Sequence, residues 1–213
     1  MARENEKIVK AHLIFCEGRD AQEFLIYCLN CWTDQGEKIF DDFQILNFGG
    51  IDELTKSLKV WQNQEGFEEV LSLSVVRDAE NDAQKATRSV ENSFKKAELP
   101  VPTAPCIRMN GLPATGYALF PDCNENPGNG TLEDLCLRIL GHEAGGTLAN
   151  ADEAIDKCPH KFKRPHKNRL HTCFSLTDTF VSLQIGRAAK AGAFSFQGTE
   201  MDNLKKFLRA MRG

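Results

Sequence analysis

The chain has 213 residues, of which 41% are hydrophobic and 26% charged, and 26 Lys and Arg against 30 Asp and Glu give a formal net charge of −4. These values are ordinary for a soluble globular protein. No apolar run reaches the roughly 18 residues that a membrane span needs, and the first residues are acidic where a signal peptide would be basic. We therefore expect a cytoplasmic protein that does not associate with membranes. The mildly acidic balance argues against bulk coating of nucleic acid.

The first half of the chain alternates apolar strand patterns with amphipathic helix patterns. The strand patterns occupy residues 8–16, 43–48 and 70–76. The helix patterns run from a capping box at residues 20–23 to Trp32, through Leu54 to Trp61, and through Val90 and Phe94. Three strand–helix units in series imply parallel pairing, because parallel neighbours need a crossover connection that is usually a helix.

The second half of the chain changes character. Prolines divide residues 100–127 into short pieces, with strands expected at residues 106–109 and 116–120 as a hairpin across Asn110-Gly111. A capping-box pattern at Thr131 and Asp134 then opens a helix. Further helices are expected over residues 151–160, 174–190 and 201–211.

These patterns predict an α/β fold with a mostly parallel sheet flanked by helices and a helical C-terminal extension. We expect residues 1–213 to form a single domain, with its core at about 8–141 and the extension at about 142–213.

Acidic residues follow two of the expected strands. Glu17 ends the first of these, and Asp78 and Glu80 follow the third. The carboxyl ends of parallel strands emerge at one edge of a sheet, where open α/β folds bind their ligands. Clustered carboxylates repel one another, and a hard divalent cation such as Mg²⁺ is the usual remedy. The pattern therefore predicts a metal site.

Helix capping is the alternative explanation for these acids. It accounts for Asp20, Asp82 and Asp134, which stand at expected helix starts. It leaves four acids without a local structural role, namely Glu17, Asp78, Glu80 and Glu133.

Two motifs in this order resemble the Toprim domain. They are Leu-Ile-Phe-Cys-Glu-Gly-Arg-Asp at residues 13–20 and Val-Val-Arg-Asp-Ala-Glu-Asn-Asp at residues 75–82. That domain is shared by type IA topoisomerases, bacterial primases, recombination-associated proteins and the overcoming-lysogenization-defect nucleases. The later segments 116–121, 130–135 and 185–194 are similar to small stand-alone bacterial Toprim proteins, so the resemblance covers most of the chain.

The resemblance implies roles for the acids. Glu17 would bind metal or transfer protons, and Asp78 and Glu80 would hold Mg²⁺ or Mn²⁺, with Glu80 standing where the family has the shorter Asp. A further acid and a lysine assist in the related nucleases, and Glu133 and Lys167 are the candidates here. The expected catalytic residues are thus Glu17 and Lys167, and the expected metal ligands are Glu17, Asp78, Glu80, Asp82 and Glu133.

A site of this kind suits phosphodiester chemistry, because bound Mg²⁺ can orient a phosphate and neutralise the leaving oxygen. A topoisomerase also needs a nucleophilic tyrosine carried on other domains, and this chain has only Tyr27 and Tyr117. A primase needs parts that do not fit in 213 residues. We therefore expect a nuclease or another phosphodiester-processing enzyme acting on DNA or RNA. The alternatives are a non-catalytic module that binds a nucleotide, nucleic acid or a separately encoded protein, and phosphotransfer on a small phosphorylated molecule.

A basic segment lies at residues 157–171, with six Lys or Arg, three His and no acid. In an otherwise acidic chain this favours contact with phosphates, and a solvated surface loop is the alternative. The candidate nucleic-acid contacts are Lys161, Lys163, Arg164 and Lys167. Gly49-Gly50 after the second strand either forms a tight turn into the next helix or lets backbone amides come close to a phosphate at the start of that helix.

The eight cysteines are expected to be free thiols, since nothing directs the chain to an oxidising compartment. Cys28 and Cys31 have C-x-x-C spacing but share an amphipathic helix pattern without a second matching pair. Core cysteines are favoured there over zinc. A second zinc candidate lies at the two ends of the basic segment and consists of Cys158, His160, His171 and Cys173. The spacing of these residues matches no familiar zinc module.

Overall fold

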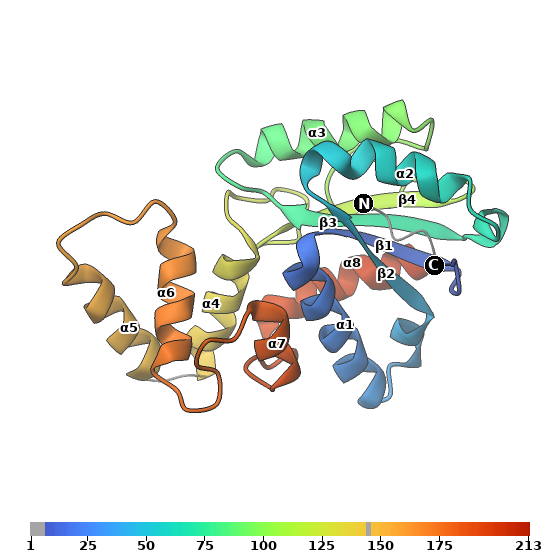
Figure 1. Ribbon diagram of the computed structural model, residues 1–213. Helices are drawn as coiled ribbons and strands as arrows, with labels where there is room; N and C mark the ends of the chain where they lie inside the picture. Colours follow the sequence, from blue (N-terminus) through green and yellow to red (C-terminus); the bar gives the residue numbers. More distant parts are fainter. Residues whose placement is uncertain (1–6, 144–145) are drawn as a thin grey trace.

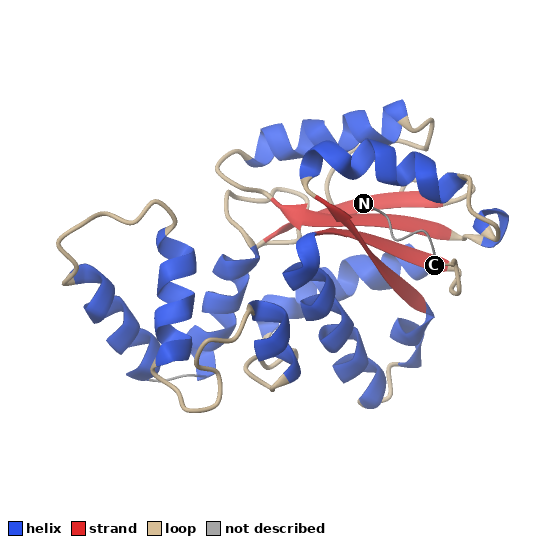
Figure 2. Cartoon of the chain, in the orientation of Figure 1, coloured by secondary structure: helices blue, strands red, loops and turns tan. Residues whose placement is uncertain are grey.

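The computed structural model describes residues 7–143 and 146–213, and a parallel β-sheet forms its centre (Figures 1 and 2). The strands are β1 (His12–Glu17), β2 (Phe43–Gly49), β3 (Ser72–Asp78) and β4 (Ala114–Phe120). Their order in the sheet is β2-β1-β3-β4, and each neighbouring pair is parallel. The expected α/β class with a parallel sheet is therefore confirmed.

Helices cover both faces of this sheet (Figure 1). On one face lie α1 (Gly18–Asp34) and α8 (Asp202–Arg212), and on the other lie α2 (Leu54–Gln62) and α3 (Ala83–Lys96). The chain between β4 and α8 forms α4 (Leu132–Glu143), α5 (Gly146–Asp156), α6 (Pro165–Ser175) and α7 (Ile185–Lys190). Helix α6 packs against α4 and α5, whereas α7 packs against α1. None of the described helices is long and apolar enough to cross a membrane.

Successive strand residues enter two separate apolar cores. Ile14 of β1 and Val76 of β3 belong to the core beneath α1 and α8, whereas Leu13 of β1 and Val75 of β3 belong to the core beneath α2 and α3. Side chains of a strand point alternately to the two faces, so a sheet covered on both sides buries both rows. This is why the strands read as continuous apolar runs in the sequence.

The strand order places a topological switch point between β1 and β3. After β1 the chain enters α1 on one face, and after β3 it enters α3 on the opposite face (Figure 1). In open α/β sheets, connections that diverge in this way leave a crevice at the carboxyl ends of the two strands, where ligands bind. Glu17 and Asp78 are the last residues of these two strands.

The C-terminal helix packs directly on the sheet. Phe207 and Met211 of α8 are buried against Gly116 of β4, where a Cβ atom would lie 2.4 Å from the Met211 Sδ. On the same face, the indole Nε1 of Trp32 in α1 donates a hydrogen bond to the Phe196 carbonyl at 2.7 Å. The end of the chain therefore contributes to the core on this face.

The predicted hairpin at residues 106–120 forms only in part, because residues 106–109 are not a strand. Its second strand exists as β4, but residues 106–109 meet β4 only through an isolated antiparallel bridge between Met109 and Thr115 and a hydrogen bond from the Cys106 amide. Cys106 has a left-handed backbone with φ of 59°, which few non-glycine residues adopt. This bend prevents the segment from continuing along the strand.

The predicted helix at residues 174–190 is wrong. The chain is helical in α6 and α7, and the connection between them is irregular. Thr177 starts a turn by accepting a hydrogen bond from the Phe180 amide at 3.1 Å, and Ser182 has a left-handed φ of 63°. β-Branched residues such as Thr179 and Val181 add little helix propensity that could oppose this break.

The two predicted capping boxes differ in outcome. At α4 one half of the box is present, because the Asp134 carboxylate accepts hydrogen bonds from the backbone amide of Thr131 at 2.8 Å and from the Thr131 hydroxyl at 3.1 Å, whereas the Asp134 amide donates to the Thr131 carbonyl. At α1 it is wrong, because the helix begins at Gly18 and Asp20 instead accepts a hydrogen bond from the Gly186 amide of α7 at 3.2 Å. The Asp20 carboxylate, which the local sequence pattern assigned to the N-cap of α1, therefore makes a tertiary contact with α7 instead.

The close packing of α8 on β4 can be tested at Gly116. The Gly116→Ala substitution should destabilise the fold by about 1–3 kcal/mol, since the new methyl group overlaps the Met211 side chain in a full core. For a chain of this length about 1 kcal/mol lowers Tm by roughly 2–4 °C in a thermal melt. Combining it with Met211→Ala should cost less than the sum of the single substitutions, because the truncation makes room for the methyl. Strictly additive losses would contradict the contact.

Candidate active site at the carboxyl edge of the sheet

Glu17 at the end of β1 pairs with a buried arginine of the neighbouring strand. Its Oε2 lies 3.1 Å from the Nε of Arg77, whose side chain is only 6% exposed. The two atoms are not aligned for a hydrogen bond, and neither finds another hydrogen-bond partner among the described residues. Burial raises the pKa of Glu17, the Arg77 charge opposes this, and the nearby negative charge of Glu80 adds to it. Glu17 is therefore a half-buried carboxyl whose charged form is less favoured than that of a free glutamate.

Asp78 at the end of β3 faces the N-terminus of α4. Its Oδ1 accepts a hydrogen bond from the Leu132 amide, the first of that helix, at 2.8 Å. Burial raises the pKa of Asp78 to about 7, the Leu132 amide opposes the shift, and the charges of Glu133, Glu80 and Glu17 raise it further. Four carboxyl groups thus lie close enough to act on one another electrostatically.

Glu133 forms an ion pair with Lys167, the lysine that the sequence analysis assigned to the site. The Lys167 Nζ, from α6, lies 2.9 Å from the Glu133 Oε1, and the Glu133 side chain is 9% exposed. Burial disfavours the charged carboxylate, but hydrogen bonds from Lys167 and Thr131 bring the pKa of Glu133 below its ordinary value. The two candidates suggested by the family resemblance therefore meet, although they are 34 positions apart in the sequence.

The loop that carries Glu80 is fastened to the loop before α4. The amide and carbonyl of Glu80 exchange hydrogen bonds with Gly130, each at 2.8 Å. Asn129 adds two more, accepting from the Ala83 amide at 2.9 Å and donating to the Asn81 carbonyl at 2.8 Å. Glu80 has a left-handed φ of 57°, which costs a residue with a Cβ about 1 kcal/mol. These hydrogen bonds hold the left-handed backbone of Glu80 in place, so that its solvent-exposed carboxylate stays near Asp78.

The Gly-rich loop needs glycine at this contact. Gly130 has a φ of +141°, and a Cβ there would lie 2.8 Å from the Pro121 ring and 3.0 Å from the Asp134 carboxylate. A side chain would push the loop away from Glu80 and from the start of α4. The sequence showed the loop, but not that its glycine fixes the position of two acids.

Asp82 and Asn47 serve the local structure at this edge. Asp82 is the N-cap of α3, and its Oδ1 accepts from the Lys85 amide at 2.9 Å, as the capping interpretation predicted. The Asn47 side chain accepts from the Gly49 amide at 2.8 Å and from the Gly18 amide at 3.1 Å, so it closes the turn after β2. The Gly49 amide is therefore already paired within the chain.

Strand alternation separates the two strand-end acids. Glu17 continues the β1 row of Leu13 and Phe15 toward α2 and α3, whereas Asp78 continues the β3 row that includes Val76, toward α1. Among residues 7–143 and 146–213, no three His, Cys, Asp or Glu side chains are placed together so that they could hold a metal ion. The acids share an edge, but their oxygens do not converge on one point.

The donor set nonetheless suits Mg²⁺. This ion takes one or two protein carboxylates and fills its remaining positions with water and substrate phosphate, so a complete protein cage is not needed. The Asp78 carboxyl is concentrated among like charges, and the Glu17 Oε2 is buried without a hydrogen bond among the described residues. The Asp78 carboxylate would gain from a cation, whereas the Glu17 Oε2 already has the Arg77 guanidinium beside it.

In the described part of the chain, neither zinc candidate brings three His, Cys, Asp or Glu side chains together so that they could hold a metal ion. All eight cysteines are free; Cys28 is buried on α1, and Cys173 is buried on α6.

The basic segment divides into an irregular stretch ending at Arg164 and the helix α6, which begins at Pro165. Lys167 is thus part of a helix, one turn beyond the exposed Lys161, Lys163 and Arg164.

Comparisons with known proteins identify a family without assigning an activity. Residues 11–212 match the family described as "Protein of unknown function (DUF3226)". The chain belongs to this family. No curated protein and no solved structure gave a significant match. The family description names no chemistry, so the Toprim resemblance remains a prediction.

Sequence reasoning assigned no role to Arg77. Its signal was present, because a charged residue inside an otherwise apolar strand must find a partner when it is buried. The partner could not be read from the sequence, since Glu17 lies 60 positions away and the pairing depends on the register of β1 against β3, in which Cys16 faces Val76.

The crowding at Asp78 predicts a pH-dependent cost to stability. The pKa of Asp78 is about 7 in the fold against an ordinary 3.8, so between these values the folded chain binds more protons than the unfolded chain and loses stability as pH rises. Asp78→Asn keeps an oxygen for the Leu132 amide and removes the charge. In EDTA, its Tm relative to wild type should therefore increase from pH 5 to pH 8, by roughly 2–4 °C per kcal/mol. Melts in which the two proteins keep a constant difference would argue against this. The exposed Asp156→Asn is the matched control.

Proposed function

We propose that this chain is a Mg²⁺-dependent enzyme that cleaves or otherwise processes nucleic-acid phosphodiesters, as a member of the Toprim group related to the overcoming-lysogenization-defect nucleases. The observation that carries the proposal is the gathering of Asp78, Glu133, Glu80 and Glu17 at the switch point of the sheet, where the charges of the other three raise the pKa of Asp78. A carboxyl whose pKa is perturbed in this way at the carboxyl edge of an α/β fold is characteristic of functional sites.

In this proposal Asp78, Glu80 and Glu133 hold Mg²⁺ or Mn²⁺. Bound metal supplies Lewis-acid stabilisation of the phosphate and of the leaving oxygen. The ion would also neutralise the like charges that raise the pKa of Asp78.

The protein groups divide the remaining work. Glu17 has a raised pKa and an oxygen without a hydrogen bond, so it can hold a proton and pass it to or from an oxygen of the substrate. Arg77 lies beside it and can contact a phosphate. Lys167 neutralises Glu133 in the structure, and its ammonium could contact the substrate if a metal ion were bound beside Glu133.

One observation favours a binding module as the second candidate. Arg77 and Lys167 already neutralise Glu17 and Glu133, so the edge is partly balanced without a metal ion. A module of this kind would bind nucleic acid without cleaving it. The presence or absence of metal-dependent cleavage separates the two functions.

Cleavage assays test the proposal. Labelled single- and double-stranded DNA and RNA should be cut in Mg²⁺ or Mn²⁺ and left intact in EDTA. Glu17→Gln should reduce the rate about 10²-fold or more while the fold persists, because the amide keeps the shape and loses the ability to transfer a proton. Glu69→Gln, the same change on an exposed residue before β3, is the control.

The same proteins give a readout that needs no turnover. Mg²⁺ should raise the Tm of wild type but not of Asp78→Asn, since a ligand that binds only the folded state stabilises it. Cleavage that survives in Glu17→Gln would assign the chemistry to another site or to a contaminant. Binding without any metal-dependent cleavage would favour the module.

The basic segment generates a separate prediction about recruitment. Lys161, Lys163 and Arg164 are exposed and form no ion pair within the described residues. Replacing all three with Gln should weaken nucleic-acid binding about equally across sequences and flatten the plot of log K against log salt by roughly 2–3, since each lost phosphate contact removes about 0.7–0.9 from the slope. An unchanged affinity and slope would show that the segment is a solvated surface.

A further inference from the structure

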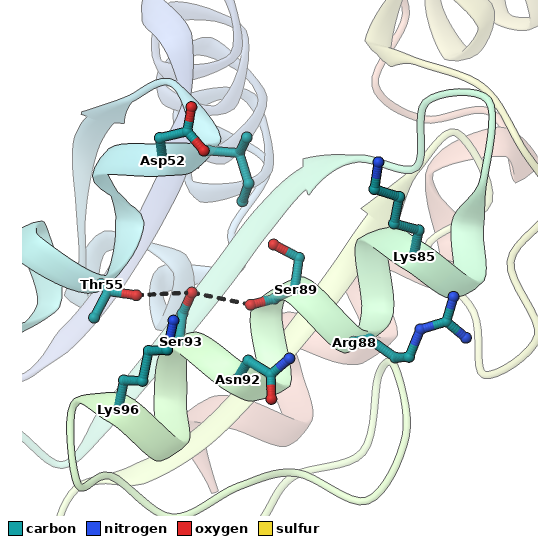
Figure 3. Close-up of a pocket in the computed structure, with 9 residues that line it drawn as sticks. Asp52, Thr55, Lys85, Arg88, Ser89, Asn92, Ser93 and Lys96 are labelled. Carbon is teal, nitrogen blue, oxygen red and sulfur yellow. Dashed lines mark hydrogen bonds between the residues drawn. The ribbon is translucent and has the colours of Figure 1, made fainter.

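A polar groove lies between α2 and α3, on the opposite side of the sheet from α8 (Figure 3). It encloses about 430 Å³. Its lining is almost entirely polar: Ile51, Asp52, Thr55, Lys85, Arg88, Ser89, Asn92, Ser93 and Lys96. The Thr55 hydroxyl donates to the Ser93 hydroxyl at 3.1 Å, and Ser93 donates to the Ser89 carbonyl at 2.9 Å, so the two helices are joined at the groove.

Three cations line this groove without partners. Lys85 and Arg88 stand near the start of α3 and Lys96 at its end, and none forms an ion pair with any residue in the described ranges (Figure 3). Asp52 is the single acid of the lining. The groove therefore carries an excess of positive charge in a chain whose net charge is −4.

The spacing of the polar residues makes the groove a track along the helix. Lys85, Ser89, Asn92 and Lys96 follow one another at intervals of four, three and four residues, which places them on one face of α3. At 1.5 Å per residue this row is about 16 Å long. A ligand that follows it must be extended and negatively charged.

The groove continues into the candidate active site. A neighbouring cavity of about 320 Å³ shares Ile51, Lys85 and Ser89 with it and is also lined by Arg77 and Glu80. Arg77 is the residue that pairs with Glu17. Cationic and hydroxyl groups thus run from Lys96 to Arg77, and the acids Glu80 and Asp82 join them where the cavity reaches the carboxyl edge of the sheet.

We propose that this groove binds the phosphate backbone of a nucleic-acid strand and leads it to the carboxyl edge, with Lys85, Arg88 and Lys96 as the phosphate contacts. The proposal rests on the proposed function in that it takes nucleic acid as the substrate. It adds a binding surface on the α2 and α3 face, away from the basic segment at α6.

The lining favours backbone phosphates over nucleobases. Among its residues only Ile51 is apolar and none is aromatic, so the groove offers no ring on which a base could stack. Lysine, arginine and hydroxyl groups suit phosphate oxygens and carry no sequence information by themselves. Binding through this groove should therefore be independent of sequence and grow with strand length.

The test is a binding titration in EDTA, so that cleavage plays no part. Fluorescein-labelled oligothymidylates of about 4 to 16 nucleotides are titrated by anisotropy at roughly 50–200 mM salt. Changing Lys85, Arg88 and Lys96 together to Gln should flatten the salt slope by about 2, since each single-strand contact contributes about 0.7. The control neutralises three exposed lysines distant from the groove, Lys38, Lys190 and Lys206, and should leave the slope unchanged.

Each outcome decides a different question. A groove variant that binds with the wild-type slope, or a wild type that binds no oligonucleotide, overturns the inference. ATP or pyrophosphate binding as tightly as the longest oligonucleotide would assign the groove to small phosphorylated molecules and overturn it too. Groove-dependent binding without any metal-dependent cleavage would retain the groove and reject the proposed enzyme. Metal-dependent cleavage by the wild type, together with a groove variant that binds with the wild-type salt slope, would retain the proposed enzyme and reject the groove.

Discussion

The parallel pairing of β1 with β3 is the constraint on which the rest of the structure depends. Both strands are central and covered on both faces, and each is followed by a helix that packs on a different face. The chain therefore diverges where these strands end, and a crevice remains that neither helix fills. Glu17 and Asp78 close the two strands. Their meeting at one edge follows from the strand order and does not require any local helix cap.

Burial and neighbouring acids raise the pKa of Asp78 and of Glu17 at this edge, so the charged forms of these two groups are disfavoured in the fold, whereas the pKa of Glu133 is lowered. Arg77 and Lys167 neutralise two of the acids, and the Leu132 amide stabilises Asp78, whose pKa nevertheless rises to about 7. Buried ion pairs add little net stability when both partners must lose their water. The arrangement is therefore hard to explain as a stabilising device, and the proposed binding of a cation and a phosphate would account for it.

The sequence predicted the four strands of the sheet, its parallel type and the edge at which the acids lie, because apolar runs and helical periodicity are local properties. It did not predict contacts that depend on packing between distant segments. The role of Arg77 needed the register of β1 against β3, and the groove of Lys85 and Lys96 needed α2 to lie beside α3. Cys106 and Ser182 have left-handed backbones within the expected strand at residues 106–109 and the expected helix at residues 174–190. Neither Cys nor Ser is a residue type from which such a conformation can be predicted.

The alternation of strand side chains divides the candidate site into two halves. Glu17, Arg77 and the cationic groove belong to the side of α2 and α3, whereas Asp78, Glu133 and Lys167 belong to the side of α4 and α6. In the free chain Arg77 pairs with Glu17 and Lys167 pairs with Glu133, while strand alternation keeps the two halves apart. In the proposed function a phosphate at the edge lies between the halves and can contact both. The substrate backbone, together with the cation it brings, would then supply the link that the protein side chains lack on their own.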